Sequence, residues 1–131
     1  MPDYGFVKTL DLGFDEAIAA VTAELKKDGF GVLSRIDVHL KLKEKLAVDR
    51  EPYVILGACH PASADAVLQK EPDIGLMLPC NVCVSVRGGV TVLAVIKPSA
   101  AMQSVGNPAL ADIAADIEAR LKAVFDRVGS A

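Results

Sequence analysis

The stretch Asn81-Val-Cys-Val-Ser-Val-Arg-Gly-Gly-Val-Thr-Val-Leu-Ala-Val-Ile-Lys97 decides the fold of this chain. Valine, isoleucine and threonine are typical of strands, and here they lie on both sides of Gly88-Gly89. Two consecutive glycines permit positive φ at both central positions of a two-residue turn. The stretch therefore predicts a β-hairpin with strands over 81–87 and 90–97.

Further elements are predicted on either side of the hairpin. Apolar runs indicate three more strands, over 4–10, 31–38 and 53–58. Apolar residues at helical spacing indicate helices over 14–28, 40–48, 61–71 and 107–128. Asn107 is suited to the N-cap of the last helix and Pro108 to its first position. The sum is a two-layer α+β fold in a single domain over 1–131, with a mixed sheet of about five strands, helices packed on it and a C-terminal amphipathic helix.

Composition limits the classes of protein that fit. Hydrophobic residues make up 52% and charged residues 24% of the 131 residues, which is typical of a folded globule. A net charge of −3 gives no general attraction to nucleic acid or to an anionic membrane. The chain shows no signal peptide and no apolar run of roughly 18 residues. We therefore expect a cytoplasmic protein with no nucleic-acid or membrane partner, whose three cysteines are free thiols, a redox pair or metal ligands.

The hairpin register places one cysteine beside a cation. Counting back from the turn gives three cross-strand pairs: Arg87 with Val90, Cys83 with Ala94, and Cys80 with Lys97. A nearby ammonium favours the thiolate form, so Cys80 is the candidate nucleophile and Lys97 its assisting residue. Cys80 and Cys83 have the spacing of redox and zinc motifs, but a strand directs them to opposite faces. Cys83 is therefore interpreted as a small buried hydrophobe.

Cys59 and Cys80 form a second candidate pair. They meet only if the segment between them returns the chain to the same end of the sheet, because a parallel return would leave the sulfurs far apart. If they meet, a reversible disulfide, a persulfide carrier site or a copper(I) site becomes possible, with Met77 or Met102 as weak additional ligands. Otherwise both cysteines only fill tight corners beside prolines. The sequence does not decide between these alternatives.

The two histidines receive different interpretations. His60 follows Cys59 and precedes a predicted helix, so it could act as a general base, ligate a metal or simply cap the helix. His39 has no supporting neighbours and is predicted to face solvent. Ser63 has no visible histidine or acidic partner in the sequence, which argues against a hydrolase.

Two long segments carry a family resemblance. They read Tyr53-Val-Ile-Leu-Gly-Ala-Cys-His-Pro61 and Glu71-Pro-Asp-Ile-Gly-Leu-Met-Leu-Pro-Cys-Asn-Val82, and the segments 34–38, 42–46 and 105–110 extend the likeness. Together they resemble the family called domain of unknown function 302. The resemblance implies a compact α/β domain, commonly a homodimer, with no established activity. It also marks two departures: His60 stands where the family generally has Asn, and Cys83 where it generally has an aliphatic residue.

Three hypotheses for function remain. The first is a binding or carrier module for a small molecule, with a site formed by Cys59, His60, Cys80 and Lys97. In this hypothesis the cysteines perform sulfur, redox or soft-metal chemistry, and Cys59 and Cys80 are the candidate metal ligands. The second is a partner-binding homodimer whose cysteines only pack; both faces of the hairpin are largely apolar, so a second subunit could cover one of them. The third is a thiol-dependent enzyme acting on a small apolar substrate. The sequence favours a non-enzymatic role and identifies no cofactor.

Overall fold

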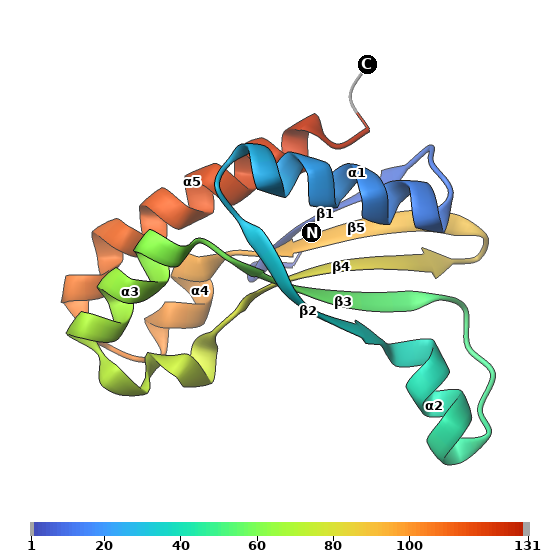
Figure 1. Cartoon of the computed structure of the whole chain (residues 1–131), viewed down its shortest axis with the longest axis horizontal. Helices are drawn as coiled ribbons and strands as arrows, with labels where there is room; N and C mark the ends of the chain where they lie inside the picture. Colours follow the sequence, from blue (N-terminus) through green and yellow to red (C-terminus); the bar gives the residue numbers. More distant parts are fainter. Residues whose placement is uncertain (1, 130–131) are drawn as a thin grey trace.

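The computed structural model describes residues 2–129, which form a single α/β domain built on one five-stranded sheet (Figure 1). In chain order the strands are β1 (Gly5–Leu10), β2 (Gly31–Asp37), β3 (Tyr53–Cys59), β4 (Cys80–Arg87) and β5 (Val90–Ile96). The helices are α1 (Phe14–Lys27), α2 (Val38–Leu46), α3 (Pro61–Lys70), α4 (Pro98–Gln103) and α5 (Ala111–Arg127), with 3-10 helices η1 (Pro72–Met77) and η2 (Pro108–Leu110). The predicted fold class, the strand number and the C-terminal helix are confirmed.

The sheet is antiparallel throughout, so the prediction of a mixed sheet is wrong in this detail. Its strand order is β1-β5-β4-β3-β2, and each of the four neighbouring pairs is antiparallel. The connection from β3 through α3 and η1 starts and finishes at one end of the sheet, so β4 runs back along β3. The hairpin register is confirmed where the strands pair, with Arg87 opposite Val90 and Cys83 opposite Ala94.

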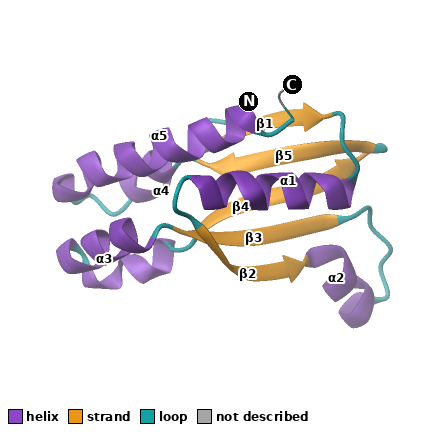
Figure 2. Ribbon diagram, turned by 45° about the horizontal axis from the view of Figure 1, so that its top comes forward, coloured by secondary structure: helices purple, strands orange, loops and turns teal. Residues whose placement is uncertain are grey.

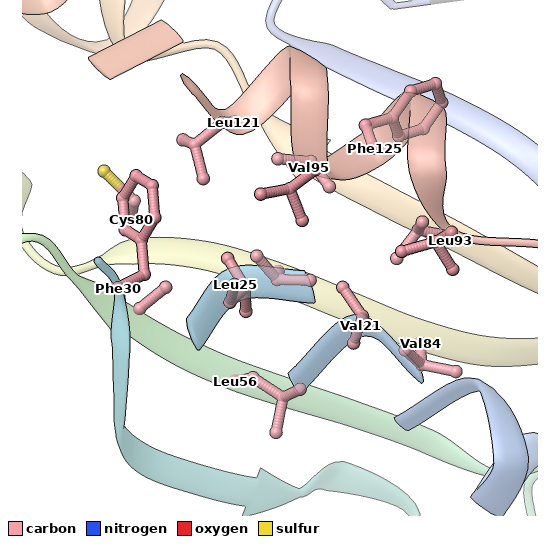
Figure 3. Packing of buried hydrophobic residues seen from close by; sticks show 14 of the residues in the cluster. Val21, Leu25, Phe30, Leu56, Cys80, Val84, Leu93, Val95, Leu121 and Phe125 are labelled. Atoms are coloured by element: carbon pink, nitrogen blue, oxygen red, sulfur yellow. The ribbon is translucent and has the colours of Figure 1, made fainter. Parts of the chain in front are cut away.

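One face of the sheet is covered by α1 and α5, and the main core lies in this layer (Figures 1 and 2). Helix α1 presents Ala17, Val21 and Leu25 to the sheet, and none of their surface is exposed. Figure 3 shows Val21 and Leu25 packed among residues of β3, β4 and β5, with Leu121 and Phe125 of α5 beside them. Alternation along β3, β4 and β5 directs side chains such as Leu56, Val84 and Leu93 into this layer, whereas the edge strand β2 has no buried residue.

The remaining helices lie beyond the two ends of the strands. At one end α3, η1 and α4 enclose a second cluster of buried residues: Val67, Ile74, Met102, Leu110 and Ala114. At the other end α2 projects away from the sheet, and none of its residues is buried (Figure 1). Within residues 2–129, no helix combines the length and apolarity needed to cross a membrane.

Candidate functional site

A cavity of about 400 Å³ lies where β3 ends, β4 begins and α3 packs against both. We call it the α3 cavity. It is lined by Phe30, Leu33, Ser34, Ala58, Cys59, His60, Ser63, Ala64, Val67, Leu68, Leu78, Pro79, Cys80 and Ile117. Three of the four predicted site residues, Cys59, His60 and Cys80, therefore come together, and Lys97 does not belong to the lining.

The local sequence explains why the cavity residues meet here. Strand β3 ends at Cys59, and α3 starts at once because Pro61 suits the first helical position. On the neighbouring strand, Ala58 pairs with Cys80. Close approach at this end needs Gly57, because a Cβ atom there would lie 2.7 Å from Cγ of Pro79. Because β4 runs antiparallel to β3, Cys59 at the end of β3 and Cys80 at the start of β4 lie at the same end of the sheet. The sequence alone had not decided whether they would.

Cys80 is a buried thiol that stays protonated at neutral pH. Its side chain is 8% exposed and belongs to the same core cluster as Phe30 (Figure 3). Burial raises the pKa of Cys80 from 9.0 to about 11, and the neighbouring Cys59 contributes to the rise. Cys80 pairs with Ala58, the residue before Cys59, and both cysteines line the α3 cavity. All three cysteines are free, so no disulfide joins them.

The prediction that Lys97 lowers the pKa of Cys80 is wrong. The Nζ atom of Lys97 lies 5.0 Å from the centroid of the Phe6 ring, and the pKa of Cys80 is raised. Strand β5 ends at Ile96, and Lys97 is already the N-cap residue of α4. The cross-strand register therefore cannot be extended as far as Lys97, and its ammonium packs on an aromatic ring instead.

His60 and Ser63 form a polar pair within the apolar cavity. The Nδ1 atom of His60 lies 2.8 Å from Oγ of Ser63, within hydrogen-bond distance, and Ser63 is buried. The His60 ring also packs on Phe30 with ring centroids 5.3 Å apart. His60 is the N-cap residue of α3, as the capping interpretation predicted, but its side chain bonds Ser63 rather than the helix backbone. The partner of Ser63 was missed by the sequence analysis, although a spacing of three at a helix start could have indicated it.

The other candidate residues lie outside the cavity. Cys83 lines another hollow together with Tyr53; it is half-buried, and burial raises its pKa. His39 does not simply face solvent as predicted, because the Tyr53 backbone N–H donates to its Nδ1 atom at 3.0 Å.

Met77 and Met102 are not part of the cavity lining. Within residues 2–129, no three His, Cys, Asp or Glu side chains are grouped to hold a metal ion, so the copper(I) hypothesis depends on the two thiols alone.

Comparison with known proteins places the chain in a family. The family model described as domain of unknown function DUF302 matches residues 6–128. The chain belongs to this family. A similar solved structure is that of an uncharacterized conserved protein DUF302 from Bacillus stearothermophilus, which is 38% identical, covers 97% of this chain and 99% of its own, and superposes with a TM-score of 0.90. No curated protein matches this DUF302 chain significantly.

Membership in the DUF302 family confirms the resemblance found in the sequence and brings no activity with it. The chemistry must therefore be argued from the cavity itself. Its lining contains no Asp, Glu, Lys or Arg, and its polar groups are the His60–Ser63 pair, the Ser34 hydroxyl and two thiols. Such a lining can bury an apolar molecule and offer it a few hydrogen bonds, while a protonated Cys80 is a weak nucleophile.

Proposed function

We propose that this DUF302 protein binds a small, neutral, largely apolar molecule in the α3 cavity. The observation that carries the proposal is the absence of any Asp, Glu, Lys or Arg from the cavity lining, in a chain of which 24% is charged. Burying a charged ligand without a paired charge is costly, so such a lining selects against ions. The volume of about 400 Å³ falls in the range of small-molecule sites, roughly 300–1,000 Å³.

The polar groups of the α3 cavity have roles in this proposal. His60 and Ser63 orient the ligand, because one of the two can turn its hydrogen bond toward a carbonyl or hydroxyl group. Cys59 and Cys80 supply polarisable walls as neutral thiols. The raised pKa of Cys80 counts against a thiol-dependent enzyme, so that alternative is not proposed. The cytoplasmic location remains a prediction from the sequence.

The proposal is tested by native mass spectrometry of protein purified without oxygen or chelator, followed by titration with the neutral fluorophore Nile red. Ala64→Leu places a larger side chain in the cavity wall, and Ala62→Leu makes the same change at an exposed position of the same helix outside the lining. We expect the control to bind the retained molecule or the dye as the wild type does, and Ala64→Leu to bind about tenfold more weakly. Equal binding by both variants, or none by the wild type, would show the proposal to be wrong.

A homodimer is the second candidate function, and the distribution of exposed hydrophobic residues favours it. Four of the ten exposed large hydrophobics within residues 2–129 fall at the end of β2, in α2 and in the following loop: Ile36 (48% exposed), Leu40 (57%), Leu46 (66%) and Val48 (37%). Such clustering marks a surface that a partner covers. The proposed interface is therefore this segment. The outer face of the hairpin, suggested by the sequence, is less suited because Ser85 and Val92 are already buried there within one chain.

Light scattering during gel filtration tests the dimer. Leu40→Asp and Leu46→Asp lie within the proposed interface, and Leu76→Asp places the same charge at an 87% exposed position in η1. We expect the wild type and the η1 variant to have the mass of two chains at micromolar concentration and the interface variants to have the mass of one. A single-chain mass for the wild type would contradict the dimer without affecting the α3 cavity.

A further inference from the structure

A second hollow lies on the sheet face opposite α1 and α5. It has a volume of about 490 Å³ and extends across β1, β5, β4 and β3. Tyr4, Tyr53, Asn81, Cys83, Arg87 and Ile96 are among its lining residues, and we call it the outer groove. It shares no residue with the α3 cavity, because strand alternation directs Cys80 to one face and Cys83 to the other.

Arg87 brings a positive charge into the outer groove. Within residues 2–129 its guanidinium makes no ion pair, although the net charge of the whole chain is −3. The Glu51 carboxylate, at the adjacent turn, instead accepts hydrogen bonds from the backbone N–H groups of Gly88 at 2.9 Å and Gly89 at 3.1 Å. The guanidinium is thus free to meet an anion from outside the chain.

The other polar side chains of the outer groove are those of Tyr4, Tyr53, Asn81 and Cys83, and the remainder of its lining is apolar. Tyr53 and Cys83 are both partly buried in this lining. Burial raises the pKa of both groups, and Arg87 lines the same hollow. The ring of Tyr4, a residue that is 70% exposed, and the apolar side chain of Ile96 complete the walls. One cation beside aromatic and aliphatic walls is complementary to a molecule with one negative end and an apolar body.

We propose that the outer groove binds a small monocarboxylate with an aromatic or branched apolar body, whose carboxylate pairs with Arg87. The planar guanidinium matches a carboxylate with two parallel hydrogen bonds. A phosphate dianion fits less well because the groove lining offers a single Lys or Arg. The volume is that of a small-molecule site. This inference is independent of the proposed function, since it concerns another face of the sheet and a ligand of another charge.

The test is a titration of the full-length, ¹⁵N-labelled protein with phenylacetate, observed through its amide resonances. Phenylacetamide, which has the same body without the charge, is the matched ligand. Arg87→Gln removes the group proposed to bind the carboxylate, and Arg87→Lys keeps its positive charge but not the planar guanidinium. Arg50→Gln removes an arginine outside the outer groove. We expect phenylacetate to cause saturable shifts of the amide resonances of Tyr53, Asn81 and Ala94 in the wild type. The wild type should bind phenylacetamide about tenfold more weakly, and Arg87→Gln should bind phenylacetate about tenfold more weakly. Arg87→Lys should bind phenylacetate with intermediate affinity, and Arg50→Gln should bind it as the wild type does.

Three results would overturn this proposal. The first is equal binding of phenylacetate and phenylacetamide, which would show that the negative charge of the ligand does not contribute to binding. The second is equal weakening by Arg50→Gln and Arg87→Gln, which would show a general effect of net charge. The third is the absence of saturable shifts at this face, including the case in which a second copy of the chain covers it. Binding in the α3 cavity is measured with a neutral dye and fails or succeeds separately.

Discussion

The raised pKa of Cys80 predicts a thiol that reacts slowly at neutral pH. Thiolates, not thiols, are alkylated, and the rise from 9.0 to about 11 lowers the thiolate fraction at pH 7 to 8 about 100-fold. Burial is the larger cause and Cys59 the smaller one. Replacing Cys59 with Ser should therefore lower the pKa of Cys80 in part and leave it above 9.0.

The assay is alkylation by iodoacetamide between pH 7 and 11.5, with the labelled peptides quantified by mass spectrometry. The Cys83→Ser variant keeps the interacting pair, and the double variant Cys59→Ser/Cys83→Ser leaves Cys80 alone. We expect the rate at Cys80 to rise up to about pH 11 in the first variant and to level off somewhat earlier in the second. A rate that levels off at or below pH 9 in both variants would refute the reasoning, because burial would then have no effect on the thiol.

Stability should follow the same titration. The folded-state pKa of Cys80 lies above the unfolded value, so the contribution of this group to stability is complete below about pH 9 and is lost as the pH rises through about 11. A rise of about two pH units corresponds to about 3 kcal/mol. Urea unfolding at pH 8 and pH 11 should show the wild type losing about 2 kcal/mol more free energy of unfolding than Cys80→Ala, because about half of the folded-state thiol is still protonated at pH 11. An equal loss in both proteins would exclude the proposed coupling.

Two further predictions concern packing and are measured by urea unfolding. Gly57→Ala should lower the free energy of unfolding by about 1–3 kcal/mol because its Cβ would clash with Oγ of Ser34 and lie 2.7 Å from Cγ of Pro79, whereas Gly75→Ala, with no atom within 4 Å, should change it little. Equal effects would contradict the close approach of β3 to Pro79. Leu121→Ala should cost about 2–5 kcal/mol because Leu121 is fully buried, and Leu76→Ala, at a residue that is 87% exposed, should cost less than about 0.5 kcal/mol. A small loss for Leu121→Ala would show that α5 is not packed on the core.

Local patterns predicted the elements of this fold well because each pattern has a local cause. Gly88-Gly89 specifies a turn, and both glycines indeed have positive φ. Pro61 occupies the first turn of α3 as predicted, whereas the short helix α4, which begins at Pro98, was not predicted. The direction of β4 relative to β3 has no such local cause. It depends on where α3 and η1 pack, through residues such as Ile74 that are brought into contact only by the tertiary fold.

The site could be predicted only in part for the same reason. Cys59, His60 and Cys80 were found because they stand at strand ends beside prolines, where chains turn and cavities form. Lys97 was assigned by extending an ideal register one pair past the end of β5, where the chain already enters α4. Alternation in a sheet holds only while the strand lasts, so predictions at strand ends fail first.

The Cys80–Cys83 spacing shows how one motif can serve two surfaces. Residues three apart in a strand face opposite sides, and here one side is closed by α1 and α5 while the other holds the outer groove. Cys80 lines a cavity with no Asp, Glu, Lys or Arg, and Cys83 lies near the guanidinium of Arg87. The two thiols lie on opposite faces of the sheet, so they cannot act as a pair. Cys80→Ser should therefore alter binding in the α3 cavity alone, and Cys83→Ser should alter binding in the outer groove alone.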